Sequence, residues 1–440
     1  MQTRPPPRAS APNLPAVRRS ISHRACAWFA LLAGVLCFTG CGGGGDGDAP
    51  TDAAPTAIVQ PLPLPGPHPI ACSNLAQDFG RVAAGADAQD YWQGRPATDG
   101  SPRYVTDLLV EPSNTLSASV SAPDDAALFG SFAGQPVGFV VLVCYPTTAD
   151  NPRPDFALPT GQRLPHMQRG AEAPLFADAS HRYPVIAFSH GLAHSPLSDD
   201  HLAVLSWLAS FGYVVIAPFH GDPRVTNLQI DDFRDAVTLV ANLSDAVAMQ
   251  ALRPLAMSAA LDLVLAHPQW RDHVDAAQIG GFGASLGGET LLLMGGAALT
   301  TSPTLAASPV GADERLKAAV GYVPYFGQPV LPAFGRDQRG LDGVTLSYLA
   351  ISGSADRTAP AQVTQQGLSR LQGPRQMVLL SGVEHTFDSS AAPDILTWSL
   401  TFLDAQVRGL PSARAQLSTM GSVAGGGHDR LVVPLNGPAP

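Results

Sequence analysis

Residues 280–290, GGFGASLGGET, place five glycines around a single serine, Ser285. Glycine is unfavourable in the interior of both helices and strands, so this density requires a turn that other residues cannot easily adopt. The run DAAQIGGF before the serine is strand-like, and LGGETLLLMGG after it is helical. The motif Gly-x-Ser-x-Gly at 283–287 therefore predicts a sharp strand-to-helix turn that exposes the Ser285 hydroxyl, with a purely structural glycine-rich turn as the alternative.

From residue 183 onward, short apolar runs alternate with segments of helical spacing. The strand-like runs are YPVIAFSH, YVVIAPFHG, AQIGGF, LKAAVGYVP, LSYLAISG and RQMVLLSG, and the helical segments include 231–250, 254–267 and 393–408. Apolar strands separated by helices are typical of a parallel sheet that is covered on both faces. The sequence therefore predicts an α/β fold with a mostly parallel central sheet and helices on both faces.

The N-terminus has the composition of an export signal. A basic stretch ending at Arg24 precedes the run ACAWFALLAGVLCF, which is too short to span a bilayer but fits the apolar region of a signal peptide over 1–40. FTGC resembles a lipobox, although Phe38 departs from the usual aliphatic residue, and it makes Cys41 a candidate for lipidation. We expect an exported protein, either a periplasmic or outer-membrane-anchored lipoprotein held at a membrane surface by this lipid, or a secreted one.

Composition also sets the expected boundaries of the folded part. Residues 41–69 are rich in Gly, Ala and Pro and predict a flexible linker. The globular domain is expected over 70–408, with an irregular N-terminal extension. Residues 145–180 form a long irregular stretch of a kind that is often functional or disordered. Residues 409–440, punctuated by Gly and Pro, predict a peripheral tail.

Charge and cysteine content bound the partners and the compartment. The net charge is −10, and the acid-free segment 1–40 contributes only positive charge, so the remainder is more acidic still. Such a body repels phosphate backbones, which argues against a nucleic-acid partner. In an oxidising compartment Cys72 and Cys144 are expected to form a disulfide, the alternative being two small buried apolar side chains.

A serine hydroxyl becomes a useful nucleophile only with a base, itself oriented by an acid. The histidines after Ser285 are His385, which follows the predicted strand QMVLLSG, and His428, which lies in the tail. Asp356 follows the predicted strand LSYLAIS and precedes a helix, where its alternative role is a helix cap. Ser285, Asp356 and His385 are therefore the predicted nucleophile, acid and base.

Two backbone N–H groups would have to stabilise the oxyanion of the reaction. One is expected from Leu286, directly after the serine. The other is expected from Leu192 in AFSHGLAHSP, where Gly191 permits close approach. His190 is expected to shape this loop, and His220, in PFHGDPR, either lines the binding pocket or fixes its own loop.

The stretches FSHGL, Gly-x-Ser-x-Gly-Gly, GSADRTAP and EHTF together resemble the α/β-hydrolase superfamily over roughly residues 130–405. More narrowly, the chain is similar to bacterial dienelactone-hydrolase-like and platelet-activating-factor-acetylhydrolase-like lipases and esterases, with a secondary likeness to cutinase-type polyester hydrolases. This resemblance implies an α/β-hydrolase fold and hydrolysis of carboxylic esters without a cofactor. Two departures stand out: dienelactone hydrolases use Cys as nucleophile, and GYVPYFGQP lacks the carboxylate that the acetylhydrolases have there.

Several alternatives stay open at this stage. The substrate is expected to be a small-molecule or lipid ester, including a polyester or a phospholipid, and the same residues would also suit amide hydrolysis. A non-catalytic surface lipoprotein on the same fold is the alternative from another class. His190, His194 and His201 suggest a metal site only weakly, because they lack a helical His-Glu-x-x-His setting, so no metal is expected. The oligomeric state is not predicted.

Overall fold

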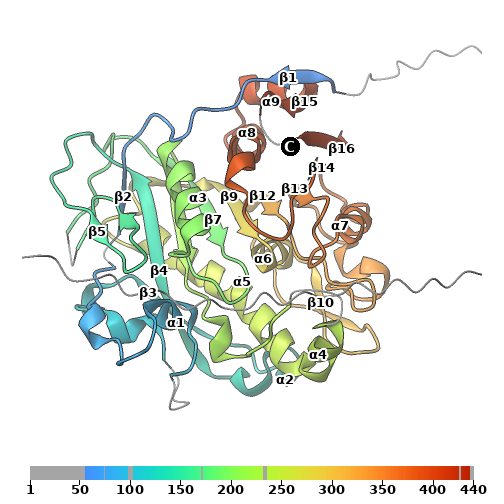
Figure 1. Ribbon diagram of the computed structural model, residues 1–440, viewed down its shortest axis with the longest axis horizontal. Coiled ribbons are helices and arrows are strands. Elements are labelled where there is room, and N and C mark those ends of the chain that lie inside the picture. Colours follow the sequence, from blue (N-terminus) through green and yellow to red (C-terminus); the bar gives the residue numbers. More distant parts are fainter. Residues whose placement is uncertain are drawn as a thin grey trace, which may run out of the picture. The chain divides into compact units, whose positions relative to one another are not determined.

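The computed structural model describes residues 55–73, 75–97, 103–169, 172–230, 235–425 and 428–436, all within the unit Ala53–Pro440. The predicted signal peptide, the candidate lipid site Cys41 and most of the predicted linker therefore lie outside the described residues. What is described is an α/β arrangement built around one ten-stranded sheet (Figure 1).

Ten strands form the central sheet. They are β2 (Ile70–Cys72), β3 (Ser117–Ser121), β4 (Pro136–Pro146), β7 (Tyr183–Ser189), β8 (Val214–Pro218), β9 (Val274–Ala284), β12 (Leu316–Tyr322), β13 (Ser347–Gly353), β14 (Arg375–Leu380) and β16 (Asp429–Asn436). Their order is β16-β14-β13-β12-β9-β7-β8-β4-β2, with β3 paired to β4. The six strands from β14 to β8 are parallel, whereas β2, β3, β4 and β16 pair antiparallel. The predicted α/β class and mostly parallel sheet are confirmed, and the sheet is mixed at both sides.

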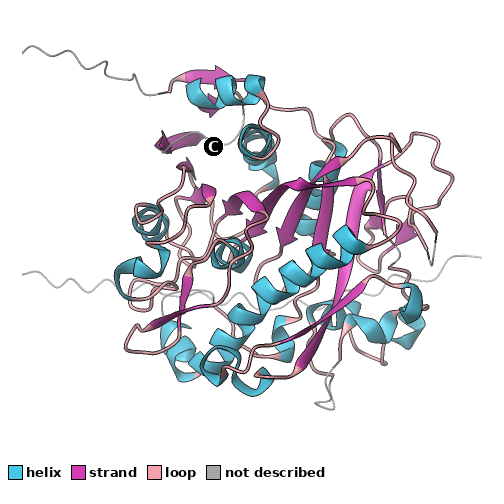
Figure 2. Ribbon diagram, turned by 180° about the vertical axis from the view of Figure 1, so that it is seen from behind, coloured by secondary structure: helices cyan, strands magenta, loops and turns pink. Residues whose placement is uncertain are grey.

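Helices cover both faces of this sheet (Figure 2). Alternate residues of β7 show the division, because Val185 and Ala187 join one core cluster while Ile186 and Phe188 join the other. The first cluster includes α2 (Ala126–Phe129), α5 (Leu243–Ala266), α6 (Leu286–Met294) and α7 (Ala361–Leu368). The second includes α1 (Ala88–Gln93), α3 (Asp199–Ser210), α8 (Ala392–Gln406) and α9 (Pro411–Thr419). Strands buried on both faces explain why the parallel strands read as continuous apolar runs.

Helix α5 differs from the prediction at one boundary. The sequence predicts a break before Pro254, but α5 continues through this residue, and the break falls at Asn242, after the short helix α4 (Asp235–Ala241). A proline inside a helix costs roughly 3 kcal/mol. Burial along most of α5 offsets that cost. Among the described helices α5 is also long and apolar enough to cross a membrane, but 72% of its apolar stretch is buried, as befits a core helix.

The predicted peripheral tail differs from the structure, because residues 409–425 and 428–436 belong to the folded domain. Within them α9 buries Leu417, β15 (Met420–Val423) buries Met420, and β16 pairs with β14 as the last strand of the sheet. The predicted linker is shortened likewise, since β1 (Ala57–Val59) pairs with β15. An edge strand needs only a backbone partner and a half-buried face, so frequent Gly and Pro nearby do not exclude it.

The N-terminal extension is tied to the sheet by the predicted disulfide. Cys72 of β2 and Cys144 of β4 are opposite each other and joined by a bond of 2.07 Å. Two-stranded sheets lie outside the central one: β5 (Phe156–Ala157) with β6 (Arg163–Leu164), and β10 (Ala298–Thr300) with β11 (Ala307–Pro309). The long stretch 145–180 thus has an antiparallel pair of its own.

Candidate active site

Ser285 occupies the predicted turn between β9 and α6. Its backbone lies at φ 52° and ψ −118°, a strained conformation for a residue with a side chain. The turn is held on both sides, because the N–H of Ser285 donates to the Tyr322 carbonyl at 2.9 Å and its own carbonyl accepts from the Tyr325 N–H at 3.0 Å. The hydroxyl is thereby presented at the carboxyl end of the parallel strands.

Two of the glycines around Ser285 are required by the close approach of backbone. A Cβ on Gly283 would lie 2.3 Å from the carbonyl of Gly287. A Cβ on Gly287 would lie 1.9 Å from the carbonyl oxygen of Ser189, at the end of β7. Neither contact is possible for real atoms, so the spacing Gly-x-Ser-x-Gly follows from the packing of β9, α6 and β7.

The structure brings the three predicted catalytic side chains together. His385 Nε2 lies 2.8 Å from Ser285 Oγ, and His385 Nδ1 lies 2.7 Å from Asp356 Oδ2. His385 follows β14, Ser285 follows β9 and Asp356 follows β13, and all three are parallel strands. The Asp356 carboxylate is fully buried, and its other oxygen accepts the Ala359 N–H at 2.7 Å. Asp356 therefore serves the local turn with one oxygen and the histidine with the other.

The two predicted oxyanion donors border the serine. Leu192 and Leu286 line the same cavity as Ser285, and a Cβ on Gly191 would be only 3.7 Å from the Cβ of Ser285. Within the described residues, neither leucine N–H donates a hydrogen bond. Leu286 also begins α6, whose N-terminus carries a partial positive charge. The arrangement leaves two N–H groups available for developing negative charge.

A buried ion pair fixes the loop 190–193 that carries Leu192. Arg253 of α5 holds Asp222 through two hydrogen bonds of 2.9 and 2.6 Å, and both side chains are 1% exposed. Arg253 also donates to the carbonyls of His190 and Gly191 at 2.7 and 3.0 Å. Asp222 Oδ2 accepts the N–H of Ala193 at 2.9 Å. The pair therefore forms hydrogen bonds with three backbone groups of the loop.

Arg253 is the functional residue that sequence reasoning missed. Its only sequence signal is a single basic residue within the apolar helical stretch 246–266. A charge in such a position is almost never fully buried without a partner, which would have prompted a search for an acid. The acid, Asp222, lies 31 residues away in sequence, and its distance from Arg253 is not readable from spacing.

The two histidines considered as pocket residues are structural. His190 Nδ1 donates to the Gly191 carbonyl at 2.8 Å, and its Nε2 accepts the His220 N–H at 3.0 Å. His220 Nε2 lies 2.9 Å from Ser189 Oγ. Neither histidine lines the cavity at Ser285. Burial holds both pKa values well below the usual value, so both imidazoles are neutral and fix their loops.

The remaining histidines of the weak metal pattern face the cavity instead. His194 and His201 both line it, and burial lowers the pKa of His201 to about 3. His201 Nδ1 is bonded to the Ser195 carbonyl at 3.1 Å. Among the described residues, no group of three or more His, Cys, Asp or Glu is arranged to hold a metal ion.

A cavity of about 440 Å³ opens at Ser285. More of its wall is apolar than polar, and the apolar part includes Val204, Leu228, Ile230, Phe282, Tyr325 and Phe387. Gln93 and Arg95, at the end of α1, also line it, whereas no described residue of 145–180 does. The size and lining are typical of a site for a small molecule. The described part of the stretch 145–180 therefore does not border this site, whereas the region around α1 does.

Glu289 is a buried carboxyl in the first turn of α6, one turn beyond Ser285. It is 1% exposed, and Gln250 Nε2 donates to its two oxygens at 2.9 and 3.1 Å. Burial raises the pKa of Glu289 to about 8, so the carboxyl is neutral at pH 7. The helix end behind the serine therefore carries no fixed negative charge that would oppose an oxyanion.

Comparison of the chain with models of known protein families finds no match, and neither does comparison with curated protein sequences. The chemistry of the site is therefore inferred from its geometry alone.

Proposed function

We propose that the protein is an exported serine hydrolase of the α/β-hydrolase type, which cleaves carboxylic esters through an acyl-enzyme on Ser285. One observation carries the proposal: an unbroken hydrogen-bond chain runs from Ser285 Oγ through His385 to Asp356, and Ser285 has a positive φ between a strand and a helix. In α/β-hydrolases the nucleophile, acid and base follow this chain order, and the second oxyanion donor comes from a loop after an earlier strand. Leu192, between β7 and α3, meets that description.

The position of the serine in the sheet supports a binding site there. From β7 the chain passes to β8 on one side of it and then to β9 on the other, so the strand order reverses between β7 and β9. In open α/β sheets, ligands bind in the crevice at the carboxyl ends of the strands at such a reversal. Ser285 follows β9, and the loop 190–193 follows β7.

The first half of the reaction forms the acyl-enzyme. Ser285 Oγ attacks the ester carbonyl while His385 Nε2 takes its proton, and Asp356 stabilises the imidazolium through Nδ1–H. The carbonyl oxygen becomes an oxyanion, which accepts hydrogen bonds from the N–H groups of Leu192 and Leu286. His385 then gives the proton to the departing alkoxide, which leaves as an alcohol.

The second half regenerates the serine. His385 removes a proton from a water molecule, whose oxygen attacks the acyl carbon, and the same two N–H groups stabilise the new oxyanion. When the tetrahedral intermediate collapses, His385 returns the proton to Ser285 Oγ and the carboxylic acid departs. The apolar lining of the cavity favours an acyl chain of short to medium length.

Replacement of the nucleophile tests the proposal. Ser285→Ala should lower kcat for p-nitrophenyl butyrate by roughly 10⁴-fold or more, with the fold intact by circular dichroism. Ser418→Ala, at an exposed serine of α9, is the matched control and should retain activity. A fluorophosphonate should label the wild type and the control but not Ser285→Ala. Unchanged turnover in Ser285→Ala would refute the assignment, and an inactive, unlabelled wild type would favour the non-catalytic alternative.

Substrate range and anchoring need separate measurements. A series of p-nitrophenyl esters from acetate to palmitate, with a phospholipid and an insoluble polyester, should give maximal kcat/KM at short to medium chains. Anchoring at Cys41, which lies outside the described residues, predicts incorporation of labelled palmitate that Cys41→Ser abolishes. Release of unlabelled protein into the medium would instead favour plain secretion.

A further inference from the structure

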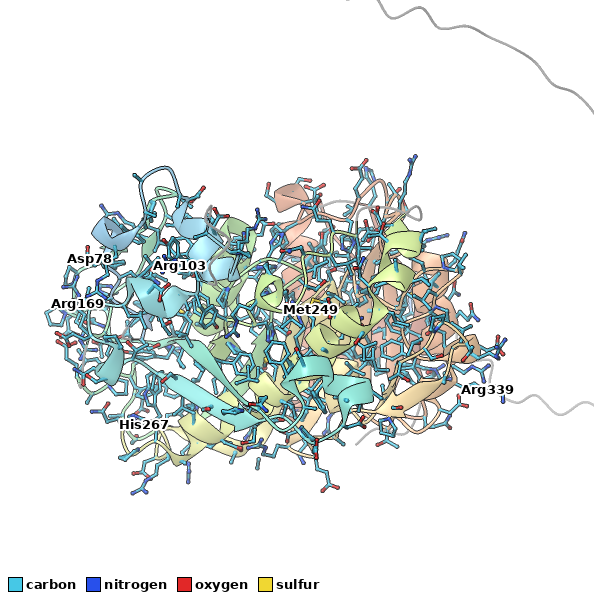
Figure 3. All side chains as sticks on the ribbon, turned by 90° about the horizontal axis from the view of Figure 1, so that it is seen from below. Asp78, Arg103, Arg169, Met249, His267 and Arg339 are labelled. Atoms are coloured by element: carbon cyan, nitrogen blue, oxygen red, sulfur yellow. A yellow bond between two sulfur atoms is a disulfide. The ribbon has the colours of Figure 1, made fainter. Side chains whose placement is uncertain are left out.

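A second cavity, of about 300 Å³, lies apart from Ser285 and is lined by β4, α5 and the loop after β8. Five apolar side chains form much of its wall: Phe132, Val137, Phe139, Met249 and Leu252. Met249, labelled in Figure 3, belongs to α5. A volume near the lower end of small-molecule sites and walls of aliphatic and aromatic groups suit an alkyl chain.

One end of this cavity carries an excess of positive charge. Arg253 and Asp222 both line it and neutralise each other, but Arg224 lines it too. The Arg224 guanidinium donates to the carbonyls of Gly138, His220 and Gly221 at 3.1, 2.9 and 3.4 Å, and it lies 3.9 Å from the ring centre of Tyr104. Within the described part of the chain no carboxylate forms an ion pair with it. An arginine that pairs with no described carboxylate, in a protein of net charge −10, is a natural partner for an anion.

A buried polar atom at the same cavity is also without a partner. His220 lines the cavity and is 4% exposed, and its Nε2 is bonded to Ser189. Its Nδ1 has no hydrogen-bond partner among the described residues. A buried donor or acceptor left unpaired costs free energy, and such groups in native proteins usually meet a ligand or a water molecule.

We propose that this second cavity binds a medium-chain carboxylate, with the alkyl chain among the apolar side chains and the carboxylate at Arg224 and His220. The binding site stands on its own geometry and goes beyond the proposed function, although such a carboxylate is the acid product of the proposed hydrolysis. A ligand here would contact Arg253 and Asp222, which hold the loop 190–193.

Methyl spectroscopy tests the site directly. The full chain contains seven methionines, so labelling with [methyl-¹³C]methionine gives few resonances, and Met249→Leu assigns the one at this cavity. Sodium octanoate should shift the Met249 methyl resonance saturably, in the wild type and equally in Ser285→Ala. Acetate, which lacks the chain, and octan-1-ol, which lacks the charge, should bind at least roughly tenfold more weakly.

Two variants separate the contribution of the Arg224 charge to binding from that of the apolar side chains that line the cavity. Arg224→Met should weaken octanoate binding at least roughly tenfold, whereas Arg182→Met, at an arginine that also donates to backbone carbonyls but does not line the cavity, should leave it unchanged. Val137→Leu, which narrows the cavity and removes no side-chain hydrogen bond, should also weaken binding. An unmoved Met249 resonance, or equal affinity in Arg224→Met, would overturn the proposal. Because the readout is not turnover, loss of the hydrolase assignment would leave this result interpretable.

Discussion

The turn at Ser285 and the loop 190–193 supply the two oxyanion donors of the proposed reaction, yet they are built in different ways. The turn is fixed by close backbone contacts, because Gly283 and Gly287 leave no room for a Cβ. The loop is fixed by the side chains of Asp222 and Arg253, which come from distant parts of the chain. Steric contacts thus fix the turn at Ser285, and a buried ion pair fixes the loop 190–193.

The difference has an energetic consequence. The steric requirement at Gly283 and Gly287 is strict, because the atoms that a Cβ would meet belong to the backbone and cannot move aside. A buried ion pair is held by charge-assisted hydrogen bonds and carries the desolvation penalty of both ions. Substitutions in the two regions should therefore differ in size and in their dependence on pH.

The largest effect is expected from Gly287→Ala. The new Cβ would meet the Ser189 carbonyl oxygen at 1.9 Å, so α6 must move away from β7. We expect a loss of more than about 4 kcal/mol in the free energy of unfolding, measured by urea denaturation, with no hydrolysis. Gly343→Ala is the control, because a Cβ there meets nothing within 4 Å, and equal stability of the two variants would contradict the steric account.

A somewhat smaller loss is expected from Arg253→Met, which leaves the Asp222 carboxylate buried and unpaired. The cost should be about 3–5 kcal/mol of unfolding free energy. Because the loop 190–193 loses its hydrogen bonds from Arg253, kcat should fall roughly 10²–10³-fold with little change in KM.

The double variant Arg253→Met/Asp222→Leu separates stability from positioning. It should recover part of the stability, since no unpaired charge remains, while kcat stays low. Normal kcat in either variant would show that the ion pair does not position the loop.

At the turn, Glu289→Gln should change the pH dependence of stability on the alkaline side. The folded pKa of about 8 lies above the unfolded value, so this carboxyl favours the folded state most at low pH and that contribution is lost as pH rises to 8. The loss amounts to about 1 kcal/mol per pH unit between pH 5 and 8. Urea denaturation across this range should give a flatter profile for Glu289→Gln, and Glu314→Gln, at an exposed position, should follow the wild type.

Beside the loop, His201→Gln should act on the acidic side, with an effect of similar size per pH unit. The folded pKa of His201, about 3, lies below the unfolded value, so stability is full above pH 6.5 and is lost as pH falls toward 3. Removing this group should reduce the acid slope of the unfolding free energy by about 1 kcal/mol per pH unit, because His190 and His220 still contribute. His181→Gln, at an exposed histidine, is the control, and an identical slope in both variants would contradict the assignment.

The same contrast explains how far the sequence could be interpreted. The turn was predictable because its signals are local in the sequence: glycine spacing, a strand before and a helix after. Asp356 and His385 were found because each follows a recognisable strand, and parallel strands bring their carboxyl ends to one edge. The hydrogen bonds from Arg253 to the loop were not predictable, since they depend on how α5 packs against the loops after β7 and β8.

Two features of the fold were missed for related reasons. The proline rule predicts a helix break at Pro254, yet α5 gains more from packing against the sheet than it loses at one hydrogen bond. The segment 409–440 contains many Gly and Pro residues, but β16 forms because β14 offers a free backbone edge. In both cases tertiary contacts outweigh a local preference that the sequence displays.

The two ends of the central sheet bear on self-association. On one side β2 has only three residues and is joined to β4 through Cys72 and Cys144. On the other side β16 begins with Asp429 and Arg430 and contains Pro434, which has no N–H to donate. Short, charged or proline-bearing edge strands are poor templates for further strands. At high local concentration, such a protein should resist edge-to-edge aggregation, even though its interior strands are strongly apolar.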